Sequence, residues 1–391
     1  MQCNPKRTIK KGQKARKITM DLLIPHSKTI RNWNYEPYSG GAKFQNGDTI
    51  MARITPCLEN GKHAFVSILD EGEIAYGSTE YFVFCGKENV SDDDFVYYLT
   101  KTPLFRESAI KSMVGSSGRQ RAQMDVLENL QMLVPKDITD QRRIASILSS
   151  LDWKIELNNK INADLEEMAQ AIFKNWFVDF EPFKDGKFVD SELGMIPEGW
   201  KVGTLGEFCK CLLGGTPSRS KEEYWNGEVN WINSGEINKF RILEASEKIT
   251  ELGLAKSATK LLPKKTTVLA ITGATLGQVS LLEIDTCANQ SVIGVLENTE
   301  VPYEYIYPFI KDRIEMLIQH QTGGAQQHIN KDNVESLIFL LPTINVLEDY
   351  ISLVSPMYKR IESQCFENLY LSLLRDTLLP RLMSGELEVP E

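Results

Sequence analysis

One pattern occurs twice in this chain, first as GSSGRQRAQMDVLENLQMLVP at 115–135 and again as TGGAQQHINKDNVESLIFLLP at 322–342. Superposing Pro135 on Pro342 aligns the two stretches at a constant offset of 207 residues. The aligned pairs are Leu133 with Leu340, Leu130 with Leu337, Glu128 with Glu335, Asp125 with Asp332 and Gln120 with Gln327. Self-similarity at a fixed offset indicates a repeated structural unit. We therefore expect two copies of one unit in this chain.

The segments around this repeat also recur in the same order. Ahead of it lie GDTIMARITPCLENGK at 47–62 and KKTTVLAITGATLGQ at 264–278, whose β-branched residues and Gly or Pro turns predict strands and hairpins. Behind it lie long helical patterns at 139–177 and 346–383. Two copies of a mixed β unit followed by a helix predict an α+β fold with pseudo-twofold organisation. Such a protein suits a ligand with two different sites at a fixed spacing, and duplex DNA is the obvious one.

Both helical patterns carry a narrow apolar seam, which favours packing against another helix rather than a sheet. The seam residues, at three- and four-residue steps, are Ile144, Ile147, Leu148, Leu151, Ile155, Leu165, Met168 and Ile172 in the first helix and Leu347, Ile351, Val354, Tyr358, Ile361, Leu371, Leu374 and Leu378 in the second. Asn162 and Asn368 interrupt the seams at matching places. We predict that the helices pack as an antiparallel coiled coil, and that these two asparagines form a polar layer that fixes its register.

These patterns divide the chain into five parts. They are a first mixed α/β domain at 1–135, a central spacer helix at 136–178, a linker rich in Pro, Gly and charge at 179–196, a second mixed α/β domain at 197–342 and a distal spacer helix at 343–391. The second domain opens with a strand expected from Trp200 to Phe208, and the first domain has no counterpart of it. Either the N-terminal edge of the first domain is truncated relative to the second, or the start codon is misassigned.

The composition is that of an ordinary globular protein, with 42% hydrophobic and 25% charged residues. No apolar run approaches the ~20 residues of a membrane span, and the polar, basic N-terminus is unlike a signal sequence, so we expect a cytoplasmic protein. Seven scattered cysteines predict reduced thiols rather than disulfides. The four histidines are not spaced as zinc ligands, and we expect no metal site.

The net charge of −9 argues mildly against nucleic-acid binding, because neutralisation of phosphates supplies most non-specific affinity. The distribution of charge weakens that argument, since residues 1–31 hold nine basic side chains and a single acidic one. A basic N-terminal segment in an otherwise acidic chain suits a protein that faces DNA with one side. A solvated basic surface is the alternative.

Sequence motifs of catalysis are missing. An adenine methyltransferase would need an NPPY or DPPF motif, whereas the single Asn-Pro pair, Asn4-Pro5, is followed by Lys6. The chain contains neither the GxxxxGK[ST] loop that cradles ATP phosphates nor a GxSxG nucleophile elbow. A cluster of acidic and basic residues at 179–187 lies in the linker, outside any strand context. We therefore expect this chain not to be an enzyme.

Six motifs, in order, resemble those of the specificity subunit of type I restriction-modification systems. They are ARITPCLENGK (52–62), DQRRIASILSSLD (140–152), GGTPSRSKEEYW (214–225), ITGATLG (271–277), TGGAQQHI (322–329) and LLPRLMSGE (378–386). The resemblance extends over almost the whole chain. It implies two target recognition domains, each of which reads one half of an asymmetric bipartite DNA sequence, with two antiparallel helices between them.

The resemblance also implies partners. Two methylation subunits, which bind S-adenosylmethionine and modify adenine, and ATP- and Mg-dependent restriction subunits would assemble around this chain on double-stranded DNA. The chain itself would hold no cofactor. The outward helix residues Arg142, Arg143, Lys154 and Lys160 are candidates to receive the methylation subunits, although exposed charged helix faces are usually only solvated.

The polar loops of the repeat are the first candidates for DNA contact, because small residues admit a phosphate while Arg and Gln reach guanine and adenine edges. The candidate DNA-binding residues are Ser116, Arg119, Gln120 and Arg121 in one loop, Gln326, Gln327 and His328 in the other, Arg53, Lys62, Thr272, Thr275 and Gln278 ahead of the loops, and Thr216, Ser218, Arg219 and Lys221 as a phosphate clamp. The alternatives are solvated turns for the loops and core-facing positions on the strands. Trp225 and Trp231 are interpreted as core residues.

Two other classes of function remain open. In one, the chain is a coiled-coil adaptor whose two β-rich heads bind protein or sugar, and it would show no salt-dependent binding to DNA. In the other, it is a self-contained nuclease, and the purified chain alone would cleave DNA with a metal ion.

Overall fold

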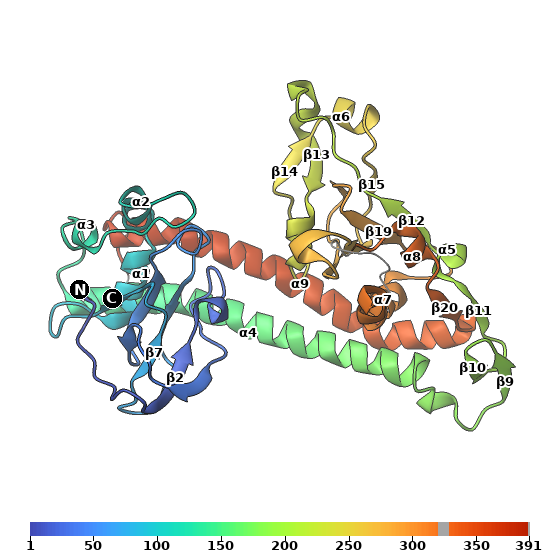
Figure 1. Cartoon of the computed structure of the whole chain (residues 1–391), viewed down its shortest axis with the longest axis horizontal. Coiled ribbons are helices and arrows are strands. Elements are labelled where there is room, and N and C mark those ends of the chain that lie inside the picture. The colour runs from blue at the N-terminus through green and yellow to red at the C-terminus, as the bar shows by residue number, and fades with distance from the viewer. Residues whose placement is uncertain (320–327, 390–391) are drawn as a thin grey trace. The chain divides into compact units, whose positions relative to one another are not determined.

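The computed structural model of the chain describes residues 1–319 and 328–389. The chain forms two compact units, and both combine a β-rich head with parts of two 40-residue helices, α4 (Ile138–Phe177) and α9 (Ile344–Met383) (Figure 1). Unit 1 comprises residues 1–158 and 367–391, and unit 2 comprises residues 159–366. The boundary therefore cuts through both helices, which differs from the linear division expected from the sequence.

The head of unit 1 contains two four-stranded sheets. The first has the order β1 (Gln2–Cys3), β8 (Tyr81–Cys85), β5 (Thr49–Ala52), β6 (His63–Phe65), and the second has the order β3 (Asn34–Pro37), β2 (Lys14–Ile18), β7 (Ala75–Gly77), β4 (Lys43–Phe44). All neighbours are antiparallel except β2 and β7, which are parallel. The helices of this head are η1 (Met20–Leu22), α1 (Asp93–Lys101), α2 (Pro103–Lys111) and α3 (Met124–Glu128).

The head of unit 2 repeats this topology. Its sheets have the orders β12 (Lys210–Leu213), β19 (Val292–Leu296), β16 (Thr267–Ala270), β17 (Val279–Leu281) and β14 (Glu247–Ile249), β13 (Trp225–Ile232), β18 (Thr286–Ala288), β15 (Leu261–Leu262). The parallel pair recurs as β13 with β18. A parallel pair needs a long crossover, so its recurrence at the same place is strong evidence of duplication. The predicted α+β fold with two β-sheet domains is confirmed.

Unit 2 also contains elements outside these sheets. They are η2 (Glu181–Phe183), β9 (Phe188–Ser191), β10 (Gly194–Pro197), β11 (Lys201–Thr204), α5 (Leu205–Phe208), η3 (Glu222–Tyr224), η4 (Ser234–Asn238), α6 (Glu251–Ala255), η5 (Gly273–Thr275), α7 (Tyr303–Gln319), α8 (Lys331–Glu335) and β20 (Ile338–Leu341). The expected linker thus contains a β9–β10 hairpin. Strand β11 pairs with β20, whereas the corresponding residues 131–135 of unit 1 form no strand, and Leu133 there is 86% exposed.

The helix termini follow from local chemistry. Asp92 caps α1 by accepting a hydrogen bond from the Phe95 N–H at 3.1 Å, and two further acidic residues lie in the first turn, where they complement the helix dipole. Helix α2 begins at Pro103, whose missing N–H costs nothing in a first turn. These signals position α1 against the first sheet of the head, where its Phe95 and Tyr97 are buried.

The two long helices pack against each other within each unit. In unit 1, Ile144 and Leu148 near the start of α4 share a core with Leu379 and Leu382 near the end of α9. In unit 2, the end of α4 shares a core with residues 347–358 near the start of α9. In both units the start of one long helix packs against the end of the other, so the predicted antiparallel packing of α4 and α9 is confirmed.

The buried asparagines of the helices are paired differently from the expectation. Asn158 donates to Asn368 Oδ1 at 2.9 Å, and Asn162 donates to Cys365 Sγ at 3.6 Å. In an antiparallel pair, residues that face each other have numbers with a constant sum, so Asn162 lies opposite Cys365 rather than opposite Asn368. Both Asn158 and Asn162 are buried, and a role of the layer in fixing register stays a prediction.

Candidate nucleic-acid interface

The loop of unit 1 at 115–121 is a closed turn whose exposed side carries Arg119. Val114 and Arg121 bond to each other through both backbone groups at 2.9 and 3.0 Å, and the Arg119 N–H donates to the Ser116 carbonyl at 3.0 Å. Gly115 has φ +136°, and a Cβ there would lie 2.9 Å from the Arg119 carbonyl oxygen, so the turn requires glycine. Ser116 and Arg119 are exposed, as a contact with a ligand requires.

The two heads join this loop to the central strand with the same hydrogen bond. In unit 1 the Ala122 N–H donates to the Arg53 carbonyl at 2.8 Å, just beyond β5. In unit 2 the Ile329 N–H donates to the Ile271 carbonyl at 3.0 Å, just beyond β16. Ala122 and Ile329 are related by the offset of 207. The bond therefore holds the residue after each repeated loop beside the strand-end residues that the sequence also singled out.

Several candidates in unit 1 are already held by other groups of the protein. Arg121 forms a bidentate pair with Glu80, with Nε and Nη2 each 2.7–3.0 Å from the carboxylate. Arg53 lies 3.5 Å from the same carboxylate, and the Lys62 Nζ donates to the Met20 carbonyl at 2.6 Å. Gln120 is half-buried. Arg119 therefore differs from Arg121, because its side chain is exposed and takes no part in the ion pairs described above.

In unit 2, the four candidate residues between 216 and 221 are exposed and bonded to other groups of the protein. Arg219 stacks on Trp225, 3.6 Å from the ring centroid, and its Nη2 bonds to Glu247 at 2.9 Å. This hydrogen bond lowers the pKa of Glu247. The remaining clamp residues are bonded as Thr216 to Gln290 at 2.5 Å, Ser218 to Ser220 at 2.9 Å and Lys221 to the Tyr224 hydroxyl at 2.9 Å. Trp231 is buried, as a core residue should be, whereas Trp225 is half-buried.

The turn after β16 gathers the other candidates of unit 2. Thr272 and Thr275 are partly exposed around η5, and Gln278 is exposed beyond it. His328 is exposed next to Ile329, which the backbone bond described above holds against the same turn. Gln326 and Gln327 lie outside the described residues.

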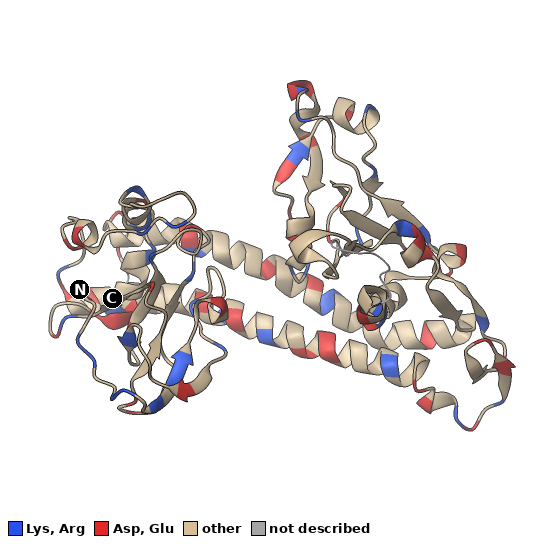
Figure 2. Ribbon diagram, viewed as in Figure 1, with Lys and Arg blue, Asp and Glu red and all other residues tan. Residues whose placement is uncertain are grey.

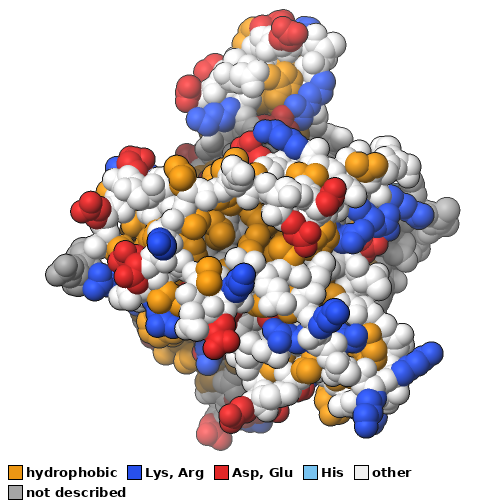
Figure 3. Space-filling view, turned by 90° about the vertical axis from the view of Figure 1, so that its left-hand side faces the viewer, with side chains coloured by type: hydrophobic (Ala, Val, Ile, Leu, Met, Phe, Trp, Pro, Cys, Tyr) orange, Lys and Arg blue, Asp and Glu red, His pale blue; other side chains and the backbone are white. Residues whose placement is uncertain are grey.

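Sequence reasoning missed two exposed aromatic residues of unit 1. Tyr35 is 63% exposed on the edge strand β3 and Trp33 is 42% exposed just before it. The Arg16 guanidinium lies 4.7 Å from the centroid of the Trp33 ring, and β2 beside it is marked by basic residues (Figure 2). The run of basic residues near the N-terminus was the sequence signal that could have identified these aromatic residues, because part of that run folds into β2 beside them. Figure 3 shows basic side chains toward the right-hand edge of one face and hydrophobic ones near its middle.

Buried ion pairs connect each head to the helices of its own unit. In unit 2, Glu166 of α4 accepts from Arg241, Tyr307 and Lys311 at 2.7, 2.6 and 2.7 Å. In unit 1, Asp152 of α4 accepts from the Tyr98 hydroxyl at 2.7 Å and from Arg375 of α9 at 2.5 Å.

These pairs position the heads rather than perform chemistry. Burial acts to raise the pKa of Glu166, but the charges of Arg241 and Lys311 outweigh it and the net shift is downward. Glu166 is therefore a fixed anion.

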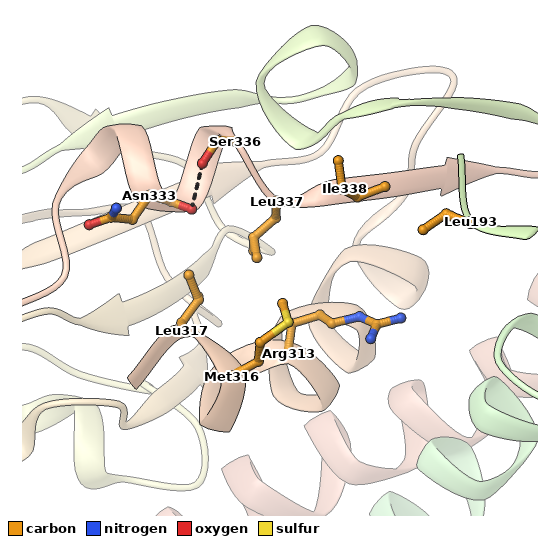
Figure 4. Close-up of a pocket in the computed structure, with 8 residues that line it drawn as sticks. All are labelled: Leu193, Arg313, Met316, Leu317, Asn333, Ser336, Leu337 and Ile338. Atoms are coloured by element: carbon orange, nitrogen blue, oxygen red, sulfur yellow. Dashed lines mark hydrogen bonds between the residues drawn. The ribbon is translucent and has the colours of Figure 1, made fainter. Parts of the chain in front are cut away.

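A cavity of about 320 Å³ in unit 2 has a mostly hydrophobic lining (Figure 4). It is lined by Leu193, Arg313, Met316, Leu317, Asn333, Ser336, Leu337 and Ile338. Leu337 and Leu317 point toward each other across it, and the Ser336 hydroxyl donates to the Asn333 carbonyl at 3.3 Å. Within residues 1–319 and 328–389, His, Cys, Asp and Glu form no cluster that could hold a metal ion. The helices of the same residues include none that is long and apolar enough to cross a membrane.

Comparison with known proteins shows the same duplication. A family model described as "Type I restriction modification DNA specificity domain" matches residues 3–167 and 197–363. The chain is 29% identical over 374 residues to the type I restriction enzyme MjaIX specificity subunit of Methanocaldococcus jannaschii, over 93% of this chain and 86% of that protein. It is 25% identical over 421 residues to the HindI specificity subunit of Haemophilus influenzae, over 90% of each. The crystal structure of a type I restriction-modification system S subunit from M. genitalium matches with a TM-score of 0.53 at 15% identity, over 96% of this chain and 92% of that one.

Proposed function

From the premise that this chain belongs to the specificity subunits of type I restriction-modification systems, we propose that its two heads read the two halves of an asymmetric bipartite DNA target. Subunits of this kind recognise the DNA target and are non-catalytic, so the predictions of family and of a non-enzymatic chain are confirmed. In the proposal, partner subunits methylate adenine with S-adenosylmethionine and cleave DNA with ATP and Mg. Two methylation subunits and the restriction subunits assemble on this chain in the cytoplasm.

The observation that carries the proposal is the backbone hydrogen bond next to the repeated loop, which recurs in both heads. It holds the residue that follows each repeated loop at the end of the central strand, while the exposed polar side chains of the two heads differ, with Ser116 and Arg119 in unit 1 and His328, Thr272 and Thr275 in unit 2. Equal scaffolds with unequal polar side chains suit two half-sites of different sequence. Arg119 is the residue best suited to bidentate recognition of guanine.

The experiment maps the methylated motif of variant complexes by long-read sequencing. Replacing Arg119 and Gln120 by Ala should weaken or relax one half-site, because each bidentate hydrogen-bonded pair with a base contributes roughly 1–3 kcal/mol of discrimination. Replacing Thr272, Thr275 and Gln278 should act on the other half-site. Lys111→Ala is the matched control, because this exposed lysine pairs with Glu107 in its own helix turn and should leave both half-sites unchanged. A loop variant in one head that alters both half-sites contradicts the proposal.

The helices are proposed to set the number of unread base pairs between the half-sites. Inserting one turn into both α4 and α9 adds ~5.4 Å, which corresponds to between one and two base-pair rises. The methylated motif should keep both half-sites and change only the gap. A change in the bases recognised, with the gap unaltered, would show that the helices do not act as the spacer.

A further inference from the structure

Each head carries a buried tyrosine and, one helical turn later, a lysine, but only one of these pairs has a carboxylate. Tyr307 and Lys311 of α7 both donate to Glu166, and the Lys311 Nζ lies 5.3 Å from the centroid of the Tyr307 ring. Tyr97 and Lys101 of α1 have the same spacing, and the Lys101 Nζ lies 5.7 Å from the centroid of the Tyr97 ring. The duplicated topology makes α1 and α7 equivalent.

In unit 1 the polar ends of this pair are buried without a partner. The Tyr97 hydroxyl and the Lys101 Nζ are both inaccessible to solvent and have no hydrogen-bond partner among the described residues. The offset of 206 that relates Asn162 to Asn368 places Ser372 at the position of Glu166, so the helix supplies no carboxylate. An unpaired buried ammonium is costly, and an acceptor is therefore required.

The space for that acceptor is a cavity of about 20 Å³. Its lining consists of His26, Met51, Leu58, Gly61, Lys62, His63, Thr100, Lys101 and Arg106. The polar side chains around Lys101 in this lining are basic apart from Thr100, and these lining residues include no Asp or Glu. About 10–15 Å³ is enough for one water-sized species, so an oxyanion such as phosphate is too large.

The carboxylates near Lys101 are bonded to other groups of the protein. Asp152 is bonded to Tyr98 and Arg375, and Asp376 is bonded to the Arg375 Nε at 2.8 Å. Their charges act on Lys101 together with those of Arg375 and Lys28, yet burial prevails and lowers the pKa of Lys101 to about 8. Lys101 is thus still cationic at pH 7. Burial lowers the pKa of His63 to about 3, so its ring, which is 3.0 Å from the Thr100 hydroxyl, is neutral.

We propose that the cavity beside Lys101 is a binding site for one monatomic anion of the halide class, which takes the place that the Glu166 carboxylate has in unit 2. Chloride has the size and the charge that the lining selects. The anion would complete the junction between α1, α2 and the loop around Gly61. It is independent of the DNA-reading function proposed above.

The test is hydrogen–deuterium exchange of the purified full chain in chloride or gluconate at constant ionic strength. Backbone amides at 58–63 and 97–106 should exchange about tenfold more slowly when chloride exceeds its dissociation constant tenfold. Lys101→Met should remove this dependence, and Ser372→Glu should remove it by supplying a carboxylate. Lys111→Met, at an exposed lysine, should retain it.

Chloride-independent exchange of the unmodified chain would overturn the proposal, as would a chloride effect that persists in Lys101→Met or Ser372→Glu. Crystals grown in bromide give a second readout that does not depend on the folding of any variant. An anomalous peak within hydrogen-bond distance of the Lys101 Nζ supports the site. A water molecule at that position, with bromide present, overturns it.

Discussion

Replacing Glu166 by Gln should destabilise unit 2 strongly, because this carboxylate is the main counter-charge of a buried arginine. Arg241 is 4% exposed and lies 2.7 Å from Glu166, whereas its next acid, Glu283, is 3.9 Å away and is shared with Lys265 at 2.6 Å. Removing one partner of a buried pair costs about 3–5 kcal/mol. The side chain of Lys311 is 34% exposed, so its pair is screened and adds little. We therefore expect the free energy of unfolding to fall by about 3 kcal/mol.

Urea unfolding of the full chain measures this decrease, and hydrogen exchange of α7 assigns it to unit 2. Glu107→Gln is the matched control, since its exposed pair with Lys111 should contribute less than about 0.5 kcal/mol. A decrease below about 1 kcal/mol for Glu166→Gln would refute the reasoning that this network anchors the head.

The same variant has a defined pH dependence. The folded pKa of Glu166 is below its ordinary value, so the carboxylate contributes stability at pH values above the unfolded pKa, about 4.3. That contribution is lost as the pH falls through the lower folded pKa. The difference in unfolding free energy between the unmodified chain and Glu166→Gln should therefore be full at neutral pH and vanish once the pH has fallen below the folded pKa of Glu166. A difference that grows on acidification would contradict this assignment.

Three further outcomes are expected. Replacing Asn158 and Asn368 together by Leu should raise the urea midpoint yet broaden the helix register seen by cysteine cross-linking, because a polar pair between the helices exchanges stability for specificity; an unchanged register speaks against the polar layer. Gly61→Ala should cost about 1–2 kcal/mol in urea unfolding, since φ is +73° and the new Cβ would lie 2.5 Å from the His26 ring. Arg121→Ala should lower the stability of unit 1 by removing the pair with Glu80, while Arg119→Ala should change the methylated half-site at unchanged stability; the reverse result would exchange their roles.

The duplicated fold and the antiparallel helices were predictable because each rests on a pattern that recurs within the chain. Apolar residues at three- and four-residue steps specify a seam, and a narrow seam needs another helix. The residue of α9 that faces each asparagine of α4 could not be predicted to within one helical turn. Matching Asn162 with Asn368 used sequence equivalence, whereas contacts in an antiparallel pair depend on where the helices cross.

The candidate site was predictable only in part. The repeated loops and the turn after β16 were found because they recur, and the backbone bond of Ala122 to Arg53 brings two of the predicted segments together. The pair of Arg121 with Glu80 joins residues 41 positions apart, which no local spacing reveals. Likewise, Tyr35 looks like any strand aromatic in the sequence, and only the sheet order shows that its strand is an edge.

The discontinuity of unit 1 has a consequence for biosynthesis. Asp152 is bonded to Arg375, 223 residues later, and at about 5–20 residues per second a ribosome needs roughly 10–45 s to supply that arginine. Unit 2 is a single stretch, 159–366, and is completely synthesised before the last part of unit 1. The unit whose head is translated first is therefore the unit completed last, and until then its α4 face stays available to chaperones in the nascent chain.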